Sequence, residues 1–179
     1  MGHARLDQGD VDGAMSAFLD AIASDPRYVP ALLSRLEILA LHRENHIGAV
    51  AAGQVLRERG VGGVVMASAL SYSLSAIGDT AEALAVIYAG LRDEPRTETL
   101  WYNAACLHAK LGQTNKAEIA LSAAVRLLPA NGAAARTDED FERFRDEAWF
   151  LGATDAARQT RDGRTAEQAL AVLGMGEAP

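Results

Sequence analysis

The stretch GDTAEALAVIYAGLRDEP, Gly78–Pro95, decides the fold because two other stretches of the chain repeat its pattern. GDVDGAMSAFLDAIASDP spans Gly9–Pro26 and GQTNKAEIALSAAVRLLP spans Gly112–Pro129, and each of the three has Gly first, Ala sixth and Pro last. The Gly permits a tight backbone turn before a helix, the small Ala permits close packing of two helices, and the Pro ends the helix. The chain therefore contains three clear copies of one helical element.

The spacing of the copies defines a repeat. Gly78 and Gly112 are 34 residues apart, whereas Gly9 and Gly78 are 69 apart, which is twice 34 plus one. A unit of 34 or 35 residues therefore occurs four times, and the second copy is degenerate and carries one extra residue. A period of 34 with two helices per unit is typical of the tetratricopeptide repeat, a helix-turn-helix module.

The chain resembles the tetratricopeptide-repeat family at particular residues. In the last unit the family's Trp, turn Gly, two Ala and Pro positions are held by Trp101, Gly112, Ala117, Ala124 and Pro129. In the first unit the turn Gly, the two Ala, the large apolar residue between them and the final Pro are Gly9, Ala14, Ala21, Phe18 and Pro26. The resemblance implies an all-α fold, a right-handed α-α superhelix of about four helix-turn-helix units followed by a capping helix.

The repeat pattern also predicts boundaries. We expect a repeat domain at 1–152 and a tail at 153–179; the units are expected at 1–28, 29–63, 64–97 and 98–131, with a capping helix at 137–152. The first unit begins only a few residues before Gly9, and a complete first helix would need about eight more residues. We therefore expect the chain to be a fragment of a longer repeat protein; a natural start with a shortened first helix is the alternative.

The segment after Pro129 is predicted to form the cap. Thr137 or Asp138 can cap a helix with an acidic first turn, along one face of which Phe141, Phe144, Ala148 and Leu151 lie. The segment is also similar to an ending common in bacterial tetratricopeptide proteins, in which WYNAAC, here at 101–106, precedes an acidic stretch, here at 138–150.

The tail is predicted to hold one short helix near 165–173. Thr165 and Gln168 have the spacing of a capping box, and Gly174 follows as a stop. We expect this helix to fold back on the cap; docking on a partner is the alternative.

The composition narrows the function classes. A net charge of −7 argues against nucleic acid as the main partner, because phosphate binding needs a basic surface. No apolar run approaches the length of a membrane span, and the first residues lack the apolar core of a signal peptide. With a single cysteine, Cys106, the chain fits a reducing compartment, and we expect a cytoplasmic protein.

The sequence contains no convincing catalytic set. His42 and His46 are four residues apart, but His46 is predicted in a turn and no third ligand with metal spacing is nearby. Cys106 and His108 are two apart, so they point from different helix faces and cannot pair as nucleophile and base. No phosphate loop, triad or redox pair occurs. We therefore predict that the chain is not an enzyme and that it has no cofactor and no metal site.

The resemblance implies a concave groove lined by the first helix of each unit. The groove positions expected here are Leu33, Glu37, Val65, Ser68, Tyr72, Ser75, Thr99, Tyr102, Asn103, Cys106 and Lys110. The groove is thus apolar and hydroxyl-bearing, and its two tyrosines are suitable anchors because each supplies a large rigid area with a polar tip. The alternative is that Tyr72 and Tyr102 only pack between helices.

Some family members clamp a peptide carboxylate with Lys, Arg and Asn. Asn103 stands where such an Asn belongs and Lys110 lies in the groove, but Glu37, Ser68 and Ser75 do not supply the other basic residues. This departure argues against binding of a chaperone tail, and Asn103 is expected to form hydrogen bonds between helices instead.

The leading hypothesis is a non-catalytic protein–protein interaction scaffold that binds a peptide or protein segment in the concave groove. A second hypothesis is a self-assembly or structural module, with homo-oligomers as the product. A third is a regulatory domain of a larger enzyme or of a secretion or assembly complex.

Overall fold

The computed structural model describes residues 2–175, and within this range the regular elements are all helical. This confirms the all-α prediction. The chain divides into two compact units, residues 1–79 and 80–179, which are described separately below. The division falls between the two helices of the predicted third repeat, 64–97.

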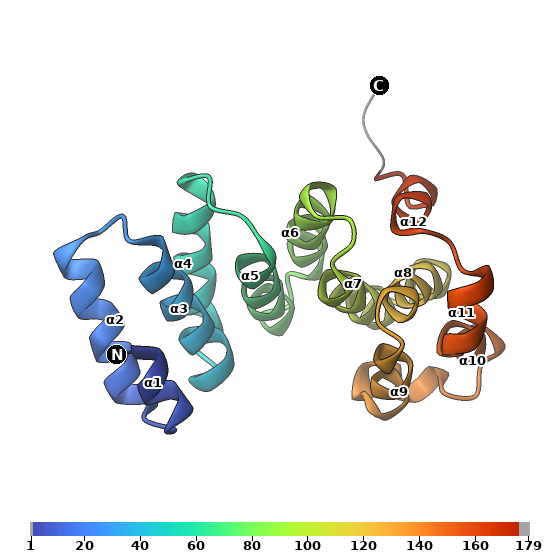
Figure 1. Cartoon of the computed structure of the whole chain (residues 1–179), viewed down its shortest axis with the longest axis horizontal. Helices are drawn as coiled ribbons and strands as arrows, with labels where there is room; N and C mark the ends of the chain where they lie inside the picture. The colour runs from blue at the N-terminus through green and yellow to red at the C-terminus, as the bar shows by residue number, and fades with distance from the viewer. Residues whose placement is uncertain (1, 176–179) are drawn as a thin grey trace. The chain divides into compact units, whose positions relative to one another are not determined.

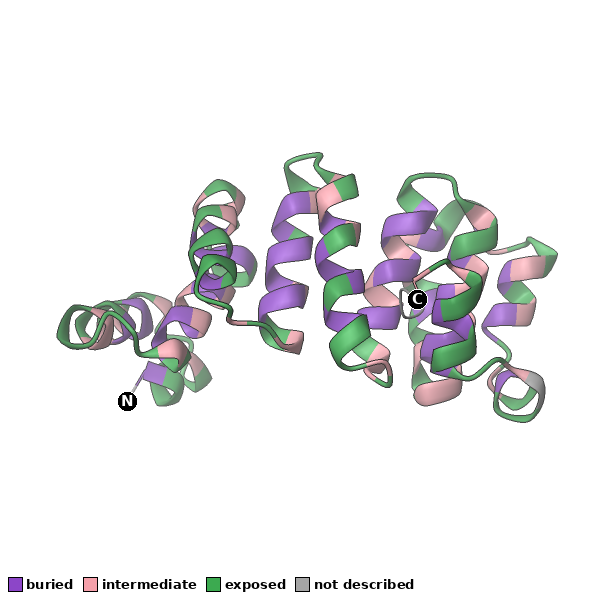
Figure 2. Cartoon of the chain, turned by 90° about the horizontal axis from the view of Figure 1, so that it is seen from above, coloured by how far each residue is buried: buried purple, intermediate pink, exposed green. Residues whose placement is uncertain are grey.

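Unit 1 is built from consecutive helices, each packed on the next (Figure 1). They are α1 (Gly2–Asp7), α2 (Val11–Ser24), α3 (Val29–Glu37), the π-helix η1 (Ile38–His42), α4 (His46–Glu58) and α5 (Val64–Ala76). Helix α3 packs on both α4 and α5, and Leu36, Leu56 and Leu70 from these three helices are completely buried. Figure 2 shows that helices carry both buried and exposed positions, as expected for amphipathic helices.

Unit 2 is organised around one helix, α8. Its elements are α6 (Thr80–Asp93), α7 (Glu98–Lys110), α8 (Thr114–Leu127), α9 (Ala130–Thr137), the 3₁₀-helix η2 (Glu139–Phe144), α10 (Ala148–Ala153), α11 (Ala156–Asp162) and α12 (Ala166–Val172). Helix α8 packs on α7, α9, α10, α11 and α12. Trp101 and Leu121 are completely buried between α7 and its neighbours, and the Trp101 indole donates to the Pro95 carbonyl over 2.7 Å. The repeat Trp therefore ties α7 to the Pro that ended α6.

The repeat glycines adopt the backbone that the sequence pattern predicts. The φ angles of Gly9, Gly78 and Gly112 are +77°, +90° and +69°. Because a side chain makes this conformation costly, Gly is the residue that closes the first helix of each repeat with least strain. Asp10, directly after Gly9, caps α2 by accepting from the Gly13 amide over 2.9 Å.

The extra residue of the second repeat coincides with the π-helix η1. At this point the Arg43 amide donates to the Ile38 carbonyl, five residues back, over 3.0 Å. A π-turn holds one more residue than an α-turn. The helix therefore accommodates the insertion without changing the packing of Leu36 before it or the Asn45 cap after it.

The predicted single capping helix at 137–152 is wrong. The segment instead forms the end of α9, then η2, then α10. Asp138 is extended, at φ −73° and ψ 132°, and its carboxylate accepts from the Asp140 amide over 2.9 Å, so it begins a new tight turn. Phe141 and Phe144 are buried as expected, but Leu151 is 53% exposed and Phe150 is buried in its place, because the break at Glu147 changes the helical register.

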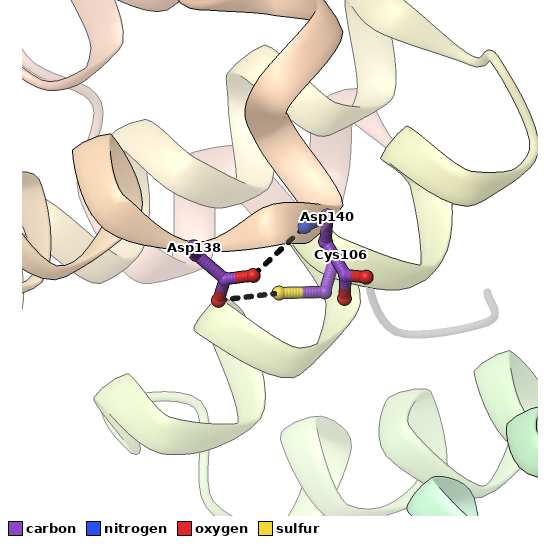
Figure 3. Close-up of side chains that lie close together, drawn as sticks. All are labelled: Cys106, Asp138 and Asp140. Carbon is purple, nitrogen blue, oxygen red and sulfur yellow. Dashed lines mark hydrogen bonds between the residues drawn. The ribbon is translucent and has the colours of Figure 1, made fainter.

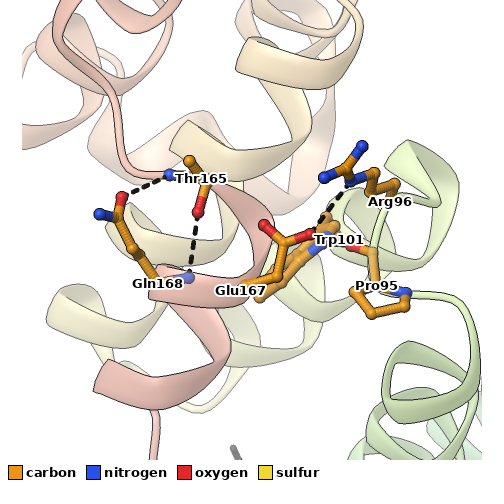
Figure 4. A network of polar contacts seen from close by, with 6 residues as sticks. All are labelled: Pro95, Arg96, Trp101, Thr165, Glu167 and Gln168. Carbon is orange, nitrogen blue, oxygen red and sulfur yellow. Dashed lines mark hydrogen bonds and ion pairs between the residues drawn. The ribbon is translucent and has the colours of Figure 1, made fainter.

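The tail folds back, but onto α8 of the last repeat as well as the end of the cap. Thr165 and Gln168 form the predicted capping box of α12 (Figure 4). Ala169 and Leu170 on this helix are buried. Helix α11 was not predicted; Asp155 caps it, and the Arg126 side chain of α8 donates to the Gln159 carbonyl over 2.9 Å. The remaining residues of the predicted tail, 176–179, lie outside the described range.

Candidate partner-binding surface

The predicted groove residues of unit 1 lie on α3 and α5. Val65, Ser68, Tyr72 and Ser75 follow each other at helical spacing along one face of α5, and Leu33 and Glu37 are partly exposed on α3. Tyr72 is 48% exposed, so it does not simply fill a gap between helices. We call these six residues the Tyr72 surface.

His46 is a neighbour of Tyr72 that the sequence reasoning did not identify. The two rings meet edge to face, with centroids 5.4 Å apart and planes at 74°. His46 opens α4, whereas Tyr72 lies on α5, so only tertiary packing brings them together. Within the described residues the buried His46 Nδ1 and Ser68 Oγ atoms lack hydrogen-bond partners. Two polar atoms beneath the Tyr72 surface therefore have hydrogen-bonding capacity that the described residues do not use.

The predicted groove residues of unit 2 lie on α7, and three of them contact η2 or its N-cap Asp138. Figure 3 shows Cys106 beside Asp138 and Asp140. The Tyr102 hydroxyl donates to Asp138 Oδ2 over 2.8 Å, and Cys106 Sγ lies 3.9 Å from the same oxygen. Lys110 Nζ is 3.3 Å from Asp140 Oδ2. The face of α7 that was expected to meet a partner is thus largely covered; Thr99 stays exposed and Asn103 is half-buried.

Two further contacts hold η2 against α7. The Tyr102 and Phe141 rings meet edge to face, with centroids 6.1 Å apart. The Arg143 guanidinium donates to the Ala109 carbonyl in the last turn of α7. A cation at this position also complements the negative end of the helix dipole. Burial of Phe141 thus holds η2 against α7. The contacts of Lys110 with Asp140 and of Arg143 with the Ala109 carbonyl fix its orientation.

The electrostatics of this contact keep the Tyr102 phenol and the Cys106 thiol protonated, so both can donate to Asp138. Burial raises the pKa of the Tyr102 phenol, and its hydrogen bond to Asp138 raises it further. Burial and the nearby Asp138 carboxylate likewise raise the pKa of the Cys106 thiol well above its usual value. Because nucleophilic cysteines need a low pKa, Cys106 has the properties of a buried structural thiol.

One group of potential metal ligands occurs among the described residues. The Cys106 sulfur and carboxylate oxygens of Asp138 and Asp140 lie within 4.8 Å of one another. The sequence analysis missed this group because Cys106 and Asp138 are far apart in the chain. Metal binding requires a thiolate, whereas this thiol has a raised pKa; moreover Tyr102 already donates to Asp138 and Lys110 pairs with Asp140. The three side chains therefore work as a polar seam between α7 and η2.

His108 points away from Cys106, toward Tyr88 of α6 and Gln113. It is buried, and its Nε2 lies 2.5 Å from the Tyr88 hydroxyl of α6. Its Nδ1 lies 2.8 Å from Gln113 Oε1. Burial lowers the pKa of His108 and raises that of Tyr88 to about 12, so the ring is neutral and accepts from the phenol.

Comparisons with known proteins agree with this geometry. Residues 98–131, which contain α7 and α8, match the family model of the tetratricopeptide repeat. The structure is similar to the crystal structure of a thermophilic tetratricopeptide-repeat protein of Thermus thermophilus, with a TM-score of 0.69 and 24% identity over 97% of this chain and 91% of that one. The comparison with curated proteins gives no match.

Paired helices closed by glycine turns define an α-helical repeat protein. More narrowly, residues 98–131 match the tetratricopeptide repeat, and the chain has the fold of a tetratricopeptide-repeat protein. This fold is generally a protein–protein interaction module. None of the helices within residues 2–175 combines the length and apolar character needed to cross a bilayer.

Proposed function

We propose that this protein is a non-catalytic scaffold that binds a segment of another protein on the Tyr72 surface of unit 1. The observation that carries the proposal is the contrast between the two predicted anchors. Tyr102 donates its hydroxyl to Asp138 and lies against η2, whereas Tyr72 is 48% exposed. Of the two tyrosines, Tyr72 therefore has its ring open to a partner.

The chemistry of the Tyr72 surface suits an extended or helical segment with an apolar side chain. The surface includes the apolar side chains of Val65 and Leu33, and Ser68 and Ser75 lie one helical turn from Tyr72 on each side. A ligand backbone that approaches Tyr72 can be met by the Ser68 hydroxyl after a rotation about a single bond. Interface energy concentrates in such aromatic anchors surrounded by weaker contacts.

The test uses a library of displayed random peptides, about 12–16 residues long, selected against the full chain. Selected peptides are then measured by fluorescence anisotropy against the native chain and two variants. Tyr72→Ala is expected to weaken binding by about 30-fold or more, because loss of a hot-spot tyrosine costs about 2 kcal/mol.

Tyr28→Ala is the matched control. Tyr28 is also in unit 1 and is also 48% exposed, but it lies in the turn before α3. We expect it to leave the affinity unchanged. Peptides that bind the folded Tyr72→Ala variant as well as the native chain would refute the assignment, and so would equal losses in both variants.

Exposed apolar residues favour homo-oligomerisation as a second candidate function. Ile47 is 77% exposed and Leu41 is also exposed, on either side of the turn that leads into α4. Sedimentation over a range of concentrations tests this. Self-association that Ile47→Lys abolishes would support it, whereas a monomer at the highest concentration would exclude it.

A further inference from the structure

A pocket of about 430 Å³ lies in unit 2 on α6, α7 and α8, apart from the Tyr72 surface. This volume falls in the range of small-molecule sites. The lining is mainly apolar, with Leu84 from α6, Leu111 after α7 and Met175 after α12. Such concave apolar sites with a few placed polar groups are typical ligand sites in proteins.

The uncharged aromatic and amide groups in the pocket wall, Tyr88, His108 and Gln113, are bonded to one another. His108 is bonded on both ring nitrogens, by Tyr88 on one side and Gln113 on the other. The imidazole therefore has no free nitrogen with which to act as a base or bind a ligand. It instead fixes the shape of the wall, since moving the ring would break both hydrogen bonds.

The charges at the pocket all have one sign. Arg92 and Lys116 line it, and Asp and Glu are missing from the lining residues that lie in the described part of the chain. Both cations are exposed, and the Lys116 charge contributes to lowering the pKa of His108, so it lies close to the pocket wall. In a chain with a net charge of −7, a pocket whose charged lining residues are both cationic favours an anion over a cation.

We propose that this pocket binds an amphipathic carboxylate, a small molecule with an alkyl chain and one carboxylate. The alkyl chain would lie against Leu84, Leu111 and Met175, and the carboxylate would meet Lys116 and Arg92. Arg presents a planar pair of donors that matches a carboxylate, and Lys adds a point charge. The proposal is independent of the peptide site on unit 1.

The probe is sodium decanoate, titrated into the full chain and followed by amide and histidine-ring NMR signals. We expect saturable shifts at Leu84, Leu111 and the His108 ring, with a Kd of about 0.1–1 mM for a ligand of this size. 1-Decanol and decylammonium have the same chain without the negative charge. Both are expected to bind at least about tenfold more weakly, because they lose the charge-assisted contacts.

Two variants test the site itself. The double variant Arg92→Gln/Lys116→Gln removes the charges and should weaken decanoate binding at least about tenfold. Ala85→Trp adds bulk at an exposed lining position and should weaken decanoate and decanol alike. Arg27→Gln, at an exposed position in unit 1, is the charge-matched control and should change nothing.

Three results would overturn the proposal. They are the lack of saturable shifts in the pocket, equal affinity for decanoate and decanol, and full decanoate binding by the folded double variant. The comparison of the three ligands uses the native chain, so it decides the charge preference even if a variant does not fold.

Discussion

At the scale of single residues, a buried histidine makes the stability of unit 2 depend on pH. His108 is neutral in the folded chain, held between Tyr88 and Gln113, with Lys116 nearby. Burial lowers its pKa below the ordinary value of about 6.5. In the unfolded chain the histidine is free to take up a proton at its ordinary pKa. Acid therefore favours the unfolded state through this residue.

We expect His108→Gln to remove part of this acid sensitivity. As the pH falls below about 6.5, the unfolded native chain binds a proton that the folded chain excludes, so the native chain loses up to about 1.4 kcal/mol per pH unit relative to the variant. The loss stops once the pH is below the lowered folded pKa. Urea unfolding at several pH values between 5 and 8 measures the difference; parallel curves for the two chains would contradict it.

A second residue-scale prediction concerns the seam between α7 and η2. Tyr102→Phe removes the hydroxyl that donates to the partly buried Asp138 carboxylate. We expect a loss of about 1–2 kcal/mol in the free energy of unfolding, as for a hydrogen bond to a charged group. Tyr72→Phe is the matched control and should stay within about 0.5 kcal/mol. Equal effects in chemical denaturation would show that the Asp138 contact contributes nothing special.

At the scale of elements, η1 shows how a repeat tolerates an insertion. Leu41, exposed in the π-helix, occupies the extra position of the second repeat. We expect deletion of Leu41 to convert η1 into α-helix and leave stability within about 1 kcal/mol of the native value, since the packing of Leu36 and the Asn45 cap remain. Deletion of Leu74, in the regular helix α5, should cost more than about 2 kcal/mol because it shifts the helical register. Circular dichroism with urea unfolding compares them, and equal losses would contradict this interpretation.

The docking of α12 on α8 is a second prediction at this scale. Leu170 is buried in the contact, while Val172 on the same helix is exposed. We expect Leu170→Ala to release α12, with a cost of about 2 kcal/mol and faster hydrogen exchange of its amides. Val172→Ala should change neither. The ion pair of Arg96 with Glu167, 3.0 Å long and exposed, cannot hold α12 in place by itself. Unchanged exchange in Leu170→Ala would contradict the role of apolar burial.

At the scale of the whole molecule, the two compact units each have a buried core. Leu36 lies in the core of unit 1 and Leu121 in that of unit 2. In repeat proteins, stability is a sum of local terms, so separate regions can unfold at different denaturant concentrations. Both tryptophans, Trp101 and Trp149, belong to unit 2. Their fluorescence therefore reports on one unit, whereas helical circular dichroism reports on both.

We expect the two signals to give unfolding transitions that do not coincide. Leu36→Ala should shift the circular dichroism curve and leave the fluorescence midpoint in place. Leu121→Ala should lower the fluorescence midpoint, with a cost of about 2–5 kcal/mol in unit 2. Coincident curves that both variants move together would instead show one cooperative transition.

The candidate site shows the limit of prediction from local patterns. Helical spacing correctly placed Val65, Ser68, Tyr72 and Ser75 on one face of α5, because residues three or four apart share a face in any α-helix. The same spacing placed Tyr102, Cys106 and Lys110 on one face of α7. Helical spacing could not show that Asp138 and Asp140 cover that face, because it describes neighbours within one helix and not contacts between residues thirty or more positions apart.

The sequence by itself determined the helices of the repeats, the glycine turns and the repeat period, because these depend on local interactions. Glycine adopts positive φ at low cost, proline ends a helix, and a spacing of 34 residues stacks similar helices. Tertiary structure alone decided which surface is left for a partner. The break at Asp138 folds η2 over α7, while Tyr72 stays exposed on α5, and the pocket beside His108 forms where α6, α7 and α8 meet. These outcomes depend on packing between distant segments, in which side chains such as Phe141 and Leu170 are buried.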